Sequence, residues 1–135
     1  MELKKSYTGF VVLLIVFLAA LFSICFLPLA DNEEMPMRLI MLIMVWFMAG
    51  LSFYVWRTEQ IYWYNGTTYE DAVAAGQERR KEFAWRHFVI FLRLALLTTA
   101  VCIATFLLGW SAWIDFAFAT VGLVVACCFT LPIKL

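Results

Sequence analysis

Charged residues are scarce in this chain, and the scarcity decides its class. Asp, Glu, Lys and Arg make up 15% of the 135 residues, whereas 65% are hydrophobic. A soluble globular domain has about a quarter charged and about half apolar residues. A water-soluble fold of this size has no place for so much apolar surface, but a lipid bilayer does. The composition therefore indicates an integral membrane protein.

The chain also lacks the patterns that carry common enzyme chemistry. Its single histidine, His87, excludes multi-histidine metal or haem ligation within one chain. It has no GxxxxGKS/T phosphate loop and no GxGxxG, HExxH or GxSxG motif. Its cysteines have no disulfide or zinc spacing and lie inside apolar runs, at Cys25, Cys102, Cys127 and Cys128. We therefore expect no enzymatic activity, no metal, no cofactor and no nucleic-acid partner.

Four apolar runs are long enough to cross a membrane. A hydrocarbon core of about 30 Å takes about 20 residues of helix, and lipid offers no partners to unpaired backbone groups. The runs cover residues 9–29, 37–56, 87–108 and 113–131. The first run is longer than a signal-peptide h-region, so we expect a retained helix. The prediction is an all-α integral membrane protein, one domain over residues 1–135, with four transmembrane helices.

Residues 57–86 form the long polar segment between the second and third runs. From Thr68 the composition favours a helix, and Thr67 and Glu70 have the spacing of a capping box. Gly76 is the weak point of that helix. The segment predicts a helical hairpin whose two arms extend the second and third spans into the cytoplasm.

The distribution of positive charge predicts the orientation. In a four-span arrangement, all but one of the ten Lys and Arg residues fall on one side, and Arg38 is the exception. The positive-inside rule then places both termini and residues 57–86 in the cytoplasm, with the protein in the plasma (inner) membrane. So strong a bias favours a single orientation.

Two groups of residues are candidates for binding. Lipid headgroups or a partner are expected at a basic cluster made of Arg79, Arg80, Lys81, Arg86 and His87. The simpler alternative is that this cluster only sets the topology. Close helix packing, within the chain or with another subunit, is predicted for the small residues Ala119, Gly122 and Ala126.

Arg93 and Asp115 form a candidate intramembrane polar site, because charges inside a membrane are functional hypotheses by default. As alternatives, Arg93 snorkels to the headgroups and Asp115 stabilises the first turn of its helix, for which Ser111 is the expected N-cap. A methionine face could bind Cu(I) or simply fill a helix interface, at Met37, Met41, Met44 and Met48.

Three functions remain open at this point. The leading hypothesis is a non-enzymatic interaction or accessory subunit that self-assembles or binds a membrane protein partner within the bilayer. The first alternative is an oligomeric channel or transporter that uses Arg93, Asp115 and the Thr and Cys side chains of the third run. The second is an immunity protein that blocks a membrane-targeting toxin.

Overall fold

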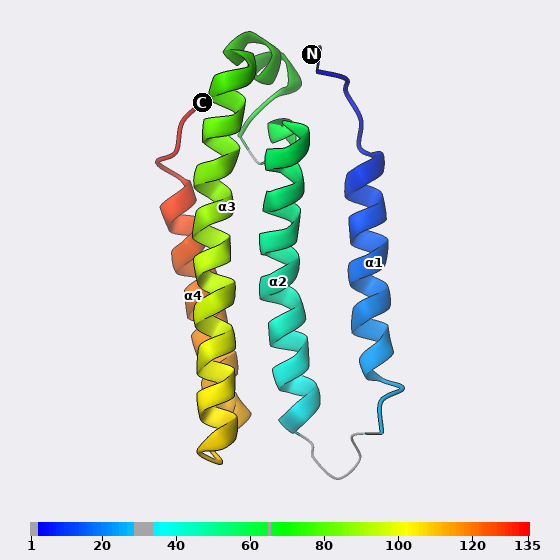
Figure 1. The fold of residues 1–135 in the computed structure, drawn as a ribbon, viewed down its shortest axis with the longest axis vertical. Coiled ribbons are helices and arrows are strands. Elements are labelled where there is room, and N and C mark those ends of the chain that lie inside the picture. The colour runs from blue at the N-terminus through cyan, green and yellow to red at the C-terminus, as the bar shows by residue number, and fades with distance from the viewer. Residues whose placement is uncertain (1–2, 29–33, 65) are drawn as a thin grey trace.

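In the part of the chain that the structure describes, four α-helices run side by side along one long axis (Figure 1). The computed structural model describes residues 3–28, 34–64 and 66–135. The helices are α1 (Thr8–Ile24), α2 (Glu34–Thr58), α3 (Tyr69–Leu107) and α4 (Ala112–Thr130), with a 3-10 turn, η1 (Ile61–Trp63), between α2 and α3. No strand occurs in these residues. The all-α class is confirmed.

Three of the helices, α2, α3 and α4, are long and apolar enough to cross a membrane. The fourth, α1, is apolar but has 17 residues, a length of about 26 Å at 1.5 Å per residue. It ends at Ile24, four residues before Pro28, and Cys25 and Phe26 continue as turn. The end of the predicted first run, residue 29, lies outside the described residues.

The core of the bundle is a three-helix arrangement, because α2, α3 and α4 all pack against one another. Large and small apolar side chains interdigitate at its centre, with Met41, Val45 and Ala49 from α2, Phe91, Leu94 and Ala95 from α3, and Ala119 and Ala126 from α4. Burial of such side chains stabilises a fold by about 1.5–3 kcal/mol for each large one in water. In a bilayer, the close packing of small residues takes over much of that role.

The first helix is attached to this core through α2 alone among the long helices of the described chain. Phe17 stacks on Phe47 with ring centres 4.2 Å apart. Near the other end of α1, Gly9 lies against Tyr54, and a Cβ atom there would come within 2.6 Å of the Tyr54 ring. Only Ile24 of α1 is buried, so most of this helix is left to face its surroundings.

The connection between α2 and α3 differs from the predicted hairpin in its first arm. The α2 helix ends at Thr58, because Glu59 adopts a left-handed backbone with φ of 60°. The chain then folds back through η1, where Ile61 and Tyr62 are buried. In a continued helix the aromatic side chains of this segment would point in different directions around the axis. The turn instead packs them together against the end of the bundle.

The second arm of the connection is helical, as expected, and α3 begins at the end of the bundle that carries both termini (Figure 1). The predicted capping box of Thr67 and Glu70 is wrong by one residue. Thr68 is the N-cap: its hydroxyl accepts from the Asp71 backbone N–H, and the Asp71 carboxylate accepts from the Thr68 N–H, both at 3.1 Å. Gly76 interrupts the helix with φ of 77° and ψ of 169°, a conformation that glycine alone adopts readily.

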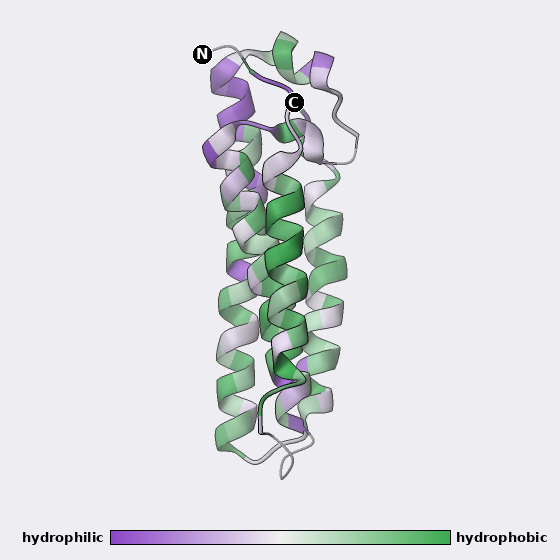
Figure 2. Ribbon diagram, turned by 90° about the vertical axis from the view of Figure 1, so that its right-hand side faces the viewer, coloured by the Kyte–Doolittle hydropathy of each residue, from purple (hydrophilic) through white to green (hydrophobic). Residues whose placement is uncertain are grey.

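The N-terminal segment fastens this end of the molecule. The Ser6 N–H donates to the Tyr62 hydroxyl at 2.8 Å, and that hydroxyl donates to the Ser6 carbonyl at 2.9 Å. The Tyr69 hydroxyl donates to the Leu3 carbonyl. Hydrophilic residues gather at this end, and the middle of the bundle is hydrophobic (Figure 2). We call the end with both termini and residues 59–81 the hairpin end.

Candidate functional sites at the two ends of the bundle

A buried ion pair joins three helices at the end opposite the hairpin. Arg38 lies in the second turn of α2 and is 6% exposed, and Asp115 lies in the first turn of α4 and is fully buried. The Arg38 guanidinium donates to the Asp115 carboxylate and to the Trp110 carbonyl. It also donates to the Thr105 hydroxyl of α3 at 2.5 Å. One arginine therefore holds α2, α3 and α4 together.

The remaining polar atoms around this pair are satisfied as well. The Thr105 hydroxyl donates to the second oxygen of Asp115 at 2.6 Å. Glu34 lies 3.6 Å from Arg38 and accepts from the Ser111 hydroxyl and the Ala112 N–H at 2.9 and 2.8 Å. Ser111 is the N-cap of α4, as predicted. Each oxygen of the Asp115 carboxylate therefore has a hydrogen-bond partner inside the bundle, as a buried charge requires.

A second ionic cluster lies at the hairpin end, around Glu59. Its carboxylate accepts from Arg80 at 2.9 and 3.2 Å and from the Gln77 amide at 2.9 Å. Arg80 is 5% exposed and also donates to the Ala72 carbonyl at 3.0 Å, across the break at Gly76. These contacts hold the left-handed residue that ends α2 against the first turns of α3.

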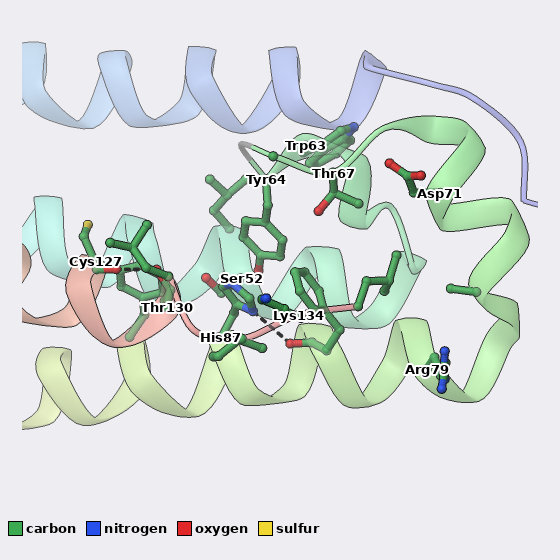
Figure 3. Close-up of a pocket in the computed structure, with 18 of the residues that line it drawn as sticks. Ser52, Trp63, Tyr64, Thr67, Asp71, Arg79, His87, Cys127, Thr130 and Lys134 are labelled. Atoms are coloured by element: carbon green, nitrogen blue, oxygen red, sulfur yellow. Dashed lines mark hydrogen bonds between the residues drawn. The ribbon is translucent and has the colours of Figure 1, made fainter.

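A hollow of about 960 Å³ opens at the hairpin end between α2, α3, the connection and the C-terminal residues. Its wall combines apolar side chains such as Met48 and Phe91 with polar ones. Ser52, Tyr64 and His87 gather on one side of it, with Lys134 from the C-terminal tail beside them (Figure 3). Arg79, Thr67 and Asp71 line its outer part.

Stacked aromatic rings form one wall of the hollow. Tyr64 and His87 stack with ring centres 4.4 Å apart, and Phe83 contacts His87 at the same distance. Nδ1 of His87 lies 2.9 Å from the Phe83 carbonyl, which fixes the ring on its helix. Burial raises the pKa of the Tyr64 phenol to about 12, against a smaller opposite influence of the Ser52 hydroxyl. Tyr64 is therefore a neutral group at physiological pH.

The predicted basic cluster is spread over several surfaces. Arg80 is buried against Glu59, and Lys81 lies 3.8 Å from the same carboxylate. Arg79 lines the hollow, and Arg86 lies on the α3 and α4 face, where it pairs with Glu82 at 2.5 Å. His87 is buried in the aromatic wall. Lipid or partner binding by these residues stays a prediction.

The structure separates the two members of the predicted intramembrane site. Asp115 is inside the bundle with Arg38, whereas Arg93 is exposed on α3 and has no hydrogen bond or ion pair with the residues the structure describes. Sequence reasoning missed Arg38 as the partner of Asp115. The available signal was that Arg38 and Asp115 lie near the starts of the second and fourth apolar runs, on the same side of a four-span arrangement, where opposite charges tend to pair.

The predicted packing residues lie at helix contacts. Ala119 and Ala126 are buried in the core, and a Cβ atom on Gly122 would come within 2.6 Å of Leu94. On the methionine face, Met41 is buried while Met44 is exposed. No group of three or more His, Cys, Asp and Glu side chains within residues 3–28, 34–64 and 66–135 has the geometry of a metal site.

Comparison with protein-family models, curated proteins and solved structures found no match to this chain.

Proposed function

We propose that this protein is a non-enzymatic interaction subunit of a membrane assembly, and that its hairpin end receives a segment of a partner protein. The observation that carries the proposal is the hollow of about 960 Å³, which is large enough for several side chains. It lies where hydrophilic residues gather, so a partner can reach it from the aqueous side (Figure 2).

The chemistry of the hollow defines the kind of segment it fits. Met48 and Phe91 offer apolar contact, and Tyr64 stacked on His87 offers a flat aromatic surface. Arg79 and Lys134 are exposed cations along its wall, and Asp71 is the acidic residue among those that line it. A peptide segment with an aromatic or aliphatic anchor beside a carboxylate matches this wall.

The polar groups of the bundle favour this role over conduction. Asp115 is hydrogen-bonded to Arg38 and Thr105, and Arg93 lies away from it on an exposed face. Between the two ends the described interior is mainly the apolar core around Val45, with Thr98 as a buried hydroxyl of α3 beside it. An immunity protein would use the same hollow, with a membrane-active toxin as its partner.

The arrangement in the membrane is part of the proposal. We infer four spans, with α1 as the shortest, and a plasma-membrane location with both termini and the hairpin end in the cytoplasm. In a cysteine-free background, Trp110→Cys should react with an impermeant maleimide in intact cells. Lys81→Cys should react only after permeabilisation. The reverse pattern would invert the proposed topology.

Photo-crosslinking in cells tests the partner site. A photoreactive amino acid at Arg79 or Thr67, inside the hollow, should give a discrete larger product whose second component mass spectrometry identifies. The same group at Val73, which is 50% exposed and outside the hollow, is the matched control. Filling the hollow with Ala74→Trp should remove the product. A bare monomer in mild detergent, with no crosslink from the hollow and no co-purifying protein, would overturn the proposal.

A further inference from the structure

A separate apolar groove of about 630 Å³ runs between α3 and α4. Its walls include Leu97, Phe118, Val125 and Phe129, all exposed on the surface of the bundle. Gly122 and Ala126 lie among the lining residues, and Leu94 packs directly against Gly122. The small residues at those two positions let α3 and α4 approach closely beneath the groove. It has the apolar lining that a hydrocarbon chain fits.

Two arginines belong to the same groove. Arg86 and Arg93 both line it, and no acidic residue does. They are seven residues apart on α3, which is about two turns and about 10 Å along one helix face. Arg86 pairs with the exposed Glu82, whereas Arg93 has no ionic or hydrogen-bonding partner in the described parts of the chain. The groove therefore places an apolar surface beside a positive charge that has no counterion among the described residues.

Arg93 lies at a depth in the membrane from which its side chain can reach the lipid phosphates. From Leu107, where α3 ends, to Arg93 the helix rises about 21 Å, and to Arg86 about 31 Å. A hydrocarbon core about 30 Å thick then ends near Arg86, with Arg93 about one and a half turns inside it. A long arginine side chain at that depth reaches outward to the phosphate layer.

We propose that this groove binds one anionic phospholipid. Its phosphate pairs with Arg93 and with the outer side of Arg86, and an acyl chain lies between Leu97, Phe118 and Val125. A second copy of the chain fits the groove poorly, because a symmetric pairing would bring the two Arg93 charges together. This site and the hollow are lined by different residues of α3, and Ile133 of the C-terminal segment lines both.

Native mass spectrometry of the full chain tests the proposal. The protein is incubated in detergent with equal amounts of phosphatidylglycerol and phosphatidylcholine that carry the same acyl chains. A base near the membrane surface gives about 1 kcal/mol toward an anionic headgroup, which corresponds to about a fivefold preference. Wild-type protein should retain phosphatidylglycerol at least about fivefold over phosphatidylcholine. Arg93→Gln should lose about fivefold of that preference, and Arg57→Gln, an exposed base outside the groove, should keep it.

A second pair of variants tests the apolar part. Val125→Trp fills the groove and should reduce retention of both lipids, whereas Val124→Trp, 60% exposed on the adjacent surface, should not. Equal retention of the two lipids by wild type, equal losses in Arg93→Gln and Arg57→Gln, or no effect of Val125→Trp would each overturn the lipid site. A dimer that Val125→Trp dissociates would replace the lipid by a second copy as the occupant.

Discussion

Replacing Asp115 by asparagine should destabilise the bundle more than any surface change of the same kind. The substitution keeps the shape of the side chain and removes its charge, so the Arg38 guanidinium stays buried without its counterion. Breaking a buried pair in this way costs about 3–5 kcal/mol. Glu34 remains 3.6 Å from Arg38 as a partial counterion, so we expect the low end, about 3 kcal/mol.

Reversible unfolding in mixed detergent micelles, followed by circular dichroism, measures this loss. The matched control is Glu82→Gln, the same carboxylate-to-amide change in the exposed pair with Arg86, where the cost should stay below about 1 kcal/mol. Asp115→Leu combined with Arg38→Met removes both charges and should be more stable than Asp115→Asn alone. The reasoning fails if Asp115→Asn has the same free energy of unfolding as wild type, or if the double variant is the least stable of the set.

Two further predictions concern the hairpin end. Gly76→Ala should cost about 1–3 kcal/mol, because φ of 77° with ψ of 169° strains any residue with a side chain. Gly50→Ala, in helix with open space around it, should instead stabilise by up to about 1 kcal/mol; equal effects in the same unfolding assay would contradict this. Since the folded pKa of Tyr64 is about 12, above the ordinary value of 10.0, its stabilising contribution is complete below pH 10 and is lost as pH rises toward 12. Spectroscopic titration should show a phenol that ionises near pH 12 in the folded protein and is missing in Tyr64→Phe; an unchanged titration curve would refute the assignment.

Local and compositional features of this fold could be predicted from the sequence. Apolar runs of about 20 residues require helices in a bilayer, and the helices appear where those runs lie. Ser111 before an apolar run is a local N-cap signal, and Gly76 is a local weak point; both have the predicted effect. The capping box failed by one residue because Thr67 and Thr68 are both good caps, and the backbone path out of the connection decides between them.

The candidate sites depend on contacts that sequence spacing does not encode. Arg38 and Asp115 are 77 positions apart, and Glu59 and Arg80 are 21 apart, so each pair forms only when helices dock. Neighbouring bases also diverge, because each residue turns a helix by about 100°. That rotation sends Arg80 into the interior, Arg79 to the hollow and Arg86 to the groove.

The sequence by itself determined that this protein is helical, belongs in a membrane and carries most of its basic residues toward one end. Those properties follow from the free energy of moving each segment out of water, which is a sum over its own residues. Only the tertiary structure decided that Asp115 pairs with Arg38, that Arg93 has no ionic partner among the described residues, and that a hollow and a groove exist. Those properties depend on the rotation and docking of helices, which the packing of side chains from distant segments fixes.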